Sequence, residues 1–160
     1  IKADGLHGVE IGSNILGRSP GDAHFDPFYA EAERLDLAIF VHALHPCATD
    51  RLVGPKPLAA FVGFPTDTGL AAASFITGRT LEKFPRLRVA FSHGGGTQAA
   101  FLPRLQNGWH IAPELRDAFA SPVETARRMF YDNIVFDPAL LRHLIATFGD
   151  TQIFAGSDYP

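Results

Sequence analysis

Short apolar runs alternate with segments of helical character along the chain. Strands are predicted over residues 8–13, 37–41, 88–92, 134–136 and 152–156. Helices are predicted between them, over residues 26–35, 65–77, 81–84, 101–109, 122–129 and 138–148. When a helix connects each strand to the next, the expected arrangement is a parallel sheet with right-handed crossovers. Two architectures fit this order, an open doubly wound sheet and part of a (β/α)₈ barrel.

Local signals define several of the predicted helix ends. Asp26 and Asp137 each precede a proline, a pattern typical of an N-cap followed by the first helical residue. Gly78 and Gly149 follow apolar helical patterns and predict helix ends. Residues 45–64 are irregular and long for a simple connection, so they predict a lid or binding loop.

Composition narrows the function classes. The 160 residues are 46% apolar and 19% charged, which indicates a globular domain, and the net charge of −3 gives no electrostatic reason to expect nucleic acid or an anionic membrane as partner. No apolar run approaches the roughly 18 residues of a membrane span. Cys47 is the single cysteine, so a reducing compartment, the cytoplasm, is expected.

Polar residues of the metal-ligand type follow three predicted strands. His42, His93 and Asp158 each come where an apolar run ends, and the carboxyl ends of parallel strands share one edge of a sheet. Imidazole and carboxylate suit zinc or another divalent first-row ion, so a metal or acid/base site is predicted. His45 is interpreted as a loop histidine because Pro46 follows it. No Gly-x-Ser-x-Gly elbow supports a serine hydrolase.

Three motifs in order carry a resemblance to a known family. They are residues 40–42 (Phe-Val-His), residues 82–96 (from Glu-Lys-Phe-Pro to Ser-His-Gly-Gly-Gly) and residues 154–160 (Phe-Ala-Gly-Ser-Asp-Tyr-Pro). The chain resembles the amidohydrolase superfamily, and in particular the branch named after aminocarboxymuconate-semialdehyde decarboxylase. The resemblance covers nearly all of residues 1–160, which are interpreted as one partial barrel domain, about strands 4 to 8, without its first strands and carboxyl-terminal end.

The resemblance implies a metal-dependent enzyme with one divalent ion, zinc or in some members manganese, and no organic cofactor. His42 and Asp158 would be metal ligands, and Asp158 would also orient water. His93 would move a proton, and the glycines after it would leave room for substrate. Arg104 would bind the carboxylate of a small carboxylic acid in the neighbouring subunit's site, which implies a homodimer.

Alternatives remain open at this point. Non-oxidative decarboxylation of a conjugated or aromatic acid is favoured over hydrolysis of a lactone or similar bond, because of Arg104 and the match to that branch. The family's first two ligands, a His-x-His or Glu-x-His pair, have no counterpart in residues 1–14, so the chain alone could be an inactive fragment. A nucleotide-binding sheet ranks last, because no Gly-x-Gly-x-x-Gly sequence is present.

Overall fold

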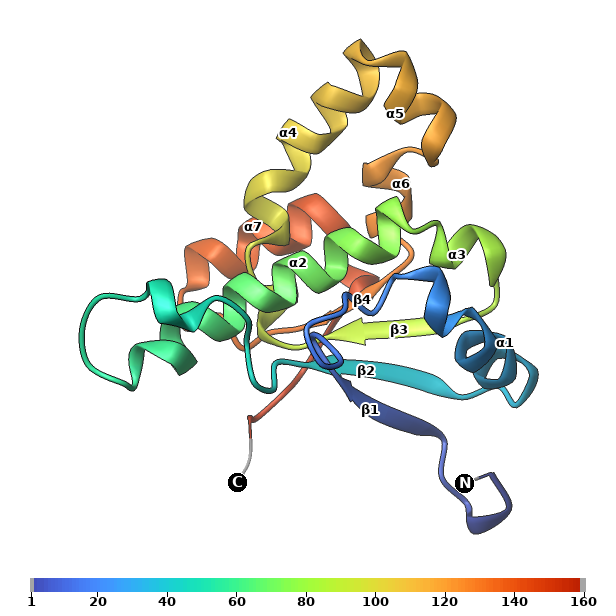
Figure 1. The fold of residues 1–160 in the computed structure, drawn as a ribbon, viewed down its shortest axis with the longest axis horizontal. Coiled ribbons are helices and arrows are strands. Elements are labelled where there is room, and N and C mark those ends of the chain that lie inside the picture. The colour runs from blue at the N-terminus through green and yellow to red at the C-terminus, as the bar shows by residue number, and fades with distance from the viewer. Residues whose placement is uncertain (1, 159–160) are drawn as a thin grey trace.

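The computed structural model describes residues 2–158, which form a layered α/β fold. The strands are β1 (Gly8–Gly12), β2 (Ala38–His42), β3 (Arg88–Phe91), β4 (Phe130–Asp132) and β5 (Ile153–Phe154). The α-helices are α1 (Asp26–Arg34), α2 (Phe64–Thr77), α3 (Thr80–Lys83), α4 (Gln98–Ile111), α5 (Pro113–Ala118), α6 (Pro122–Ala126) and α7 (Pro138–Phe148). Helices α4 and α5 form a hairpin that projects away from the sheet, whereas α2 and α7 lie beside the strands (Figure 1).

The strand order separates the two architectures that the sequence left open. All neighbouring strands pair in parallel, and their order in the sheet is β1-β2-β3-β4-β5, without the reversal of a doubly wound sheet. Side chains on one face, including Ile39, Val41 and Val89, are fully buried against the helices. The opposite face stays open in the described part of the chain, with Glu10 and Phe154 exposed. Sequential strands with helices on one face are the arrangement of part of a (β/α)₈ barrel.

A row of aromatic rings joins the helix layer to the buried face of the sheet. Tyr29 of α1 meets Phe75 of α2 at 5.4 Å between ring centroids, and Phe75 meets Phe91 of β3 at 5.5 Å. Phe91 then stacks on Tyr131 of β4, which stacks on Phe148 of α7 at 3.9 Å. Such pairs add to the free energy of burying their large apolar surfaces. The row of rings therefore sets the spacing between the strands and the helices that pack against them.

One predicted strand was wrong. Residues 134–136 do not form a strand; β4 lies four residues earlier, at Phe130–Asp132. Packing decides this, because Tyr131 occupies the fully buried position between Phe91 and Phe148, whereas Phe136 has a positive φ of 55° that no strand allows. The shift places Asp132, not Phe136, at the carboxyl end of the fourth strand.

The segment that leads into α2 departs from the expected irregular loop. Residues Ala59–Gly63 form a π-helical turn in which the N–H of Phe64 donates to the carbonyl oxygen of Ala59. Together with α2 this gives a helical segment, Ala59–Thr77, that is long and apolar enough by length and composition to cross a membrane, whereas the sequence led us to expect no apolar run of that length. Its residues Ala72 and Phe75 are fully buried in the fold, which is typical of a core helix.

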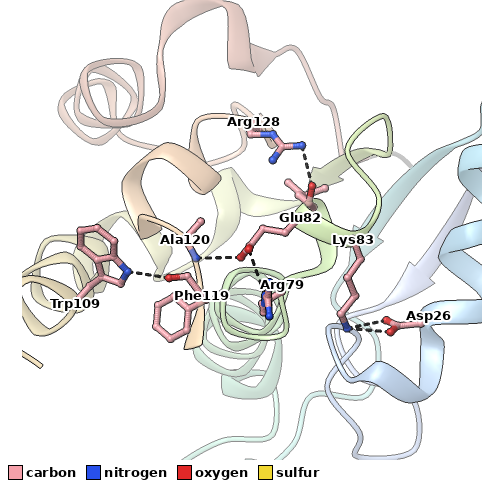
Figure 2. A network of polar contacts seen from close by, with 9 residues as sticks. Asp26, Arg79, Glu82, Lys83, Trp109, Phe119, Ala120 and Arg128 are labelled. Atoms are coloured by element: carbon pink, nitrogen blue, oxygen red, sulfur yellow. Dashed lines mark hydrogen bonds and ion pairs between the residues drawn. The ribbon is translucent and has the colours of Figure 1, made fainter. Parts of the chain in front are cut away.

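Polar contacts at the end of the sheet opposite the site tie together the segments that precede β3 and β4 (Figure 2). Glu82 accepts hydrogen bonds from the Ala120 N–H at 3.0 Å and from Arg79 at 3.2 Å. Arg128 donates to the carbonyl oxygen of Leu81, and Trp109 donates to that of Phe119, each at 2.9 Å. In barrels of this kind, residues at the amino ends of the strands serve stability. The contacts thus give the motif around Glu82 a structural role.

Candidate metal centre

Three of the predicted site residues meet at the carboxyl end of the sheet. His42 ends β2, His93 lies two residues after β3, and Asp158 lies four residues after β5. One potential ligand atom from each lies within 4.8 Å of the other two. The Nε2 atom of His42 is 3.5 Å from Oδ1 of Asp158, and Nε2 of His93 is 3.9 Å from the same oxygen. Two imidazoles and a carboxylate therefore converge from strands far apart in sequence.

This donor set fits a divalent first-row ion. Metal–ligand bonds of about 2.0–2.2 Å place two ligands of one tetrahedral ion roughly 3.2–3.6 Å apart. The separation of 3.5 Å between His42 and Asp158 lies in that range, and the 3.9 Å between His93 and Asp158 is wider. The Nδ1 atom of His42 is buried and has no hydrogen-bond partner within residues 2–158. A metal-binding histidine normally donates this proton to an outer partner, which another part of the barrel would have to supply.

Burial and the surrounding charges set the protonation of His93. Burial lowers the pKa of its imidazole, and the carboxylates of Asp132 and Asp158 oppose this shift, whereas His42 adds to it. Phe64 at the start of α2 stacks on the His93 ring, with the ring centroids 6.3 Å apart and the planes 22° from parallel. The environment favours the neutral imidazole, the form that binds a metal or accepts a proton.

The backbone turn after β3 holds His93 in an unusual conformation. His93, Gly94, Gly95 and Gly96 all have positive φ, and a histidine in this region stores backbone energy. Asp132 stabilises the turn, because its Oδ1 accepts hydrogen bonds from the Gly94 N–H at 2.8 Å and the Ile134 N–H at 3.0 Å. Sequence reasoning missed Asp132. Asp132 is also an acidic residue at the end of a strand. Because the fourth strand was predicted at residues 134–136, Asp132 was placed before that strand and was not considered as a site residue.

The glycines serve packing more than substrate. A Cβ atom at Gly94 would lie 2.5 Å from Leu144, one at Gly95 would lie 2.8 Å from Tyr131, and one at Gly96 would lie 2.0 Å from the carbonyl oxygen of Pro65. The expectation that all three leave room for substrate was therefore wrong, because α2, β4 and α7 fill that space. Gly96 alone borders the cavity beside the site.

Two other predicted residues lie outside the cluster. Arg104 is exposed on α4, in the projecting hairpin, and does not line the cavity beside His42 and His93. Its role toward a neighbouring subunit stays a prediction. His45 is exposed in the loop after β2, and its carbonyl oxygen accepts a hydrogen bond from Asn14. This placement agrees with its interpretation as a loop residue.

A family model described as amidohydrolase matches residues 1–160. The chain belongs to this family. The amidohydrolase chain is 34% identical over 160 residues to 2-amino-3-carboxymuconate-6-semialdehyde decarboxylase of Dictyostelium discoideum, covering 98% of the chain and 44% of the relative. It is 30% identical over 151 residues to 6-methylsalicylic acid decarboxylase of Penicillium expansum, covering 93% and 45% respectively.

A solved structure extends the comparison to the fold. Dihydroxybenzoic acid decarboxylase from Polaromonas, solved with bound manganese and an inhibitor, superposes with a TM-score of 0.83 at 19% identity, over 100% of this chain and 52% of that one. The chain thus has the fold of part of an amidohydrolase barrel, and it spans about half the length of the proteins it matches. The predicted fold class is confirmed.

Proposed function

We propose that this chain supplies the carboxyl-terminal half of the active site of a metal-dependent decarboxylase that acts on conjugated or aromatic carboxylic acids. The observation that carries the proposal is the convergence of His42, His93 and Asp158 beside a cavity of about 350 Å³. The decarboxylases among the relatives support the choice of reaction. The proposed domain is one barrel, of which residues 1–160 form the later strands.

His42 and Asp158 are the residues that would hold the ion, and zinc is proposed, with manganese as the alternative. When bound, such an ion acts as a Lewis acid that polarises a carboxylate or water oxygen. Catalytic zinc sites usually keep three protein ligands. The two proposed among residues 2–158 therefore predict a further ligand from the earlier strands of the complete barrel.

His93 is proposed to move the proton that decarboxylation requires. Loss of CO₂ breaks a carbon–carbon bond and leaves an electron pair on the substrate carbon, which must then take up a proton. His93 Nε2 faces Asp158, and its neutral ring can accept a proton from solvent and pass it to that carbon. The stacked Phe64 limits rotation of the ring, and Asp132 holds the turn that carries it.

The test uses the complete metal-loaded enzyme and a panel of aromatic and muconate acids, with CO₂ release as the readout. We expect release by the wild type, no turnover by His93→Ala, and about one metal ion per chain in both proteins. His143→Ala is the matched control, because His143 is exposed on α7 and does not line the cavity. Loss of metal in His93→Ala would show that His93 binds the metal ion and would contradict its role in proton transfer. Lactone hydrolysis without CO₂ release would refute the decarboxylase.

A further inference from the structure

Two exposed phenylalanines flank the cavity beside the metal centre. Phe61 comes from the π-helical turn before α2 and is 76% exposed, and Phe136 comes from the loop between β4 and α7 and is 90% exposed. Both line the cavity that His42, His93 and Asp158 also border. Large apolar side chains so exposed beside a polar centre typically mark a site that binds a ligand.

The backbone of Phe136 strengthens this interpretation. Its φ of 55° lies in the left-handed region, where a bulky aromatic residue is a genuine outlier. Residues kept in such conformations cluster at functional sites. With 90% of its surface exposed, packing within the described residues does not compensate for the strain. Because Phe136 lines the cavity, a ligand that fills the cavity would contact this side chain and supply the packing that the described residues do not.

The chemistry of the cavity wall indicates which kind of ligand would fit the cavity. Apart from His42, His93 and Asp158, the lining consists of apolar side chains and glycine: Ala60, Phe61, Phe64, Pro65, Gly96, Ile134, Val135, Phe136 and Leu140. A carboxylate at the metal centre would find polar partners, whereas a second charge on the far side of the same molecule would be desolvated without one. On this side of the metal centre the wall therefore suits an uncharged ring, and the second cavity that borders His42 and Asp158 carries the acidic side chains of Glu10 and Asp132, which repel a further carboxylate.

We propose that Phe61 and Phe136 form a phenylalanine clamp that selects acids with an uncharged, apolar ring over acids that carry a second charged group. The clamp rests on the proposed function, since it needs the substrate carboxylate at the metal centre. Phe64, stacked on His93, continues the same apolar wall toward the reacting carbon. The clamp makes Phe136 and Phe61 specificity-determining residues and leaves the chemistry to His93.

Binding to the complete metal-loaded enzyme tests the clamp with two acids of matched shape, 4-methylsalicylate and 2-hydroxyterephthalate, in which a carboxylate replaces the methyl group on the far side of the ring. The wild type should bind the methyl acid at least about tenfold more tightly, a typical effect of one apolar group in a fitted pocket. Phe136→Asn and Phe61→Ala should each weaken binding of the methyl acid by about tenfold and leave the dicarboxylate unchanged.

Stability separates the clamp from a structural role for Phe136. Asparagine tolerates positive φ better than phenylalanine, so Phe136→Asn should not lower the unfolding midpoint. Leu16→Asn is the matched control, because Leu16 has a φ of 52°, is fully exposed and lies outside the cavity. It should relieve the same strain and leave both affinities unchanged.

Two results overturn the clamp. One is equal or absent binding of the two acids by the wild type, and the other is a loss of stability in Phe136→Asn with unchanged affinities. CO₂ release from any acid of the panel, together with either result, refutes the clamp alone. Absence of CO₂ release from every acid refutes the proposed decarboxylase, whatever the two affinities are.

Discussion

Replacing Asp132 tests whether the turn that carries His93 depends on this carboxylate. Its Oδ1 accepts hydrogen bonds from the Gly94 and Ile134 N–H groups, and the residue is only 5% exposed. A hydrogen bond to a charged group contributes about 1.5–3 kcal/mol, and a buried N–H left without a partner costs about 1–3 kcal/mol. Asp132→Ala should therefore lower the free energy of unfolding by about 3–5 kcal/mol. Asp132→Asn keeps an oxygen acceptor and should cost about 1–2 kcal/mol.

The same change should reduce turnover through the position of His93. The positive φ of His93 stores about 1–3 kcal/mol, which the turn can release once Asp132 no longer holds Gly94. A shift of the imidazole by an ångström costs on the order of 10²-fold in rate. We expect kcat to fall by about this factor in Asp132→Ala, with KM nearly unchanged, and to recover most of its value in Asp132→Asn.

Urea unfolding and steady-state kinetics of the complete enzyme measure both effects. Asp137→Ala is the matched control, since Asp137 accepts hydrogen bonds from the N–H groups of Ala139 and Leu140 at the start of α7, outside the cavity. Its loss should cost about 1 kcal/mol and leave kcat unchanged. An Asp132→Asn variant as impaired as Asp132→Ala would refute the reasoning, because charge and not the acceptor oxygen would then be decisive.

Three further changes probe separate parts of the chain. Arg104→Ala should raise KM for acidic substrates by about tenfold if Arg104 binds a carboxylate. An unchanged KM in steady-state assays would show that Arg104 does not bind the substrate. Gly96→Ala should destabilise the fold by about 3 kcal/mol or more, because the added Cβ would lie 2.0 Å from the Pro65 oxygen and the φ of 60° disfavours alanine. Thermal unfolding measures this loss of stability, and a loss under about 1 kcal/mol would contradict the prediction. Glu82→Ala should lower stability by about 1–2 kcal/mol with kcat unchanged, since it removes the acceptor of the Ala120 N–H far from His93, and a changed kcat would show that the two ends of the sheet are coupled.

Local chemistry made much of the helix layer predictable. Asp137 caps α7 as expected, because an N-cap needs only neighbouring backbone N–H groups. The Asp26-Pro27 signal placed α1 correctly although the cap differs: Phe25 is the N-cap and Asp26 lies in the first turn. The strand-end positions of His42 and His93 followed from continuous apolar runs before them. These features depend on residues close together in the chain.

The misplaced fourth strand shows where such reasoning stops. Residues 134–136 are as apolar as a strand, yet Val135 and Phe136 line a cavity, and the apolar pattern of a cavity wall equals that of a buried strand. The choice of Phe130–Asp132 depends on Tyr131 packing against Phe91 and Phe148, which come from elements far away in sequence. Without these contacts Asp132 could not be assigned to the site.

The π-helical turn at Ala59–Gly63 has a consequence for how substrate preference can evolve. Its i to i+5 hydrogen bond, from the Phe64 N–H to the Ala59 oxygen, accommodates one more residue than an α-helical turn. Loss of a single codon in this turn would restore α-helical geometry and rotate the preceding residues by about 100° relative to α2. Phe61 would then leave the cavity while His42, His93 and Asp158 stayed in place. One deletion could thus change the accepted acid and spare the catalytic centre.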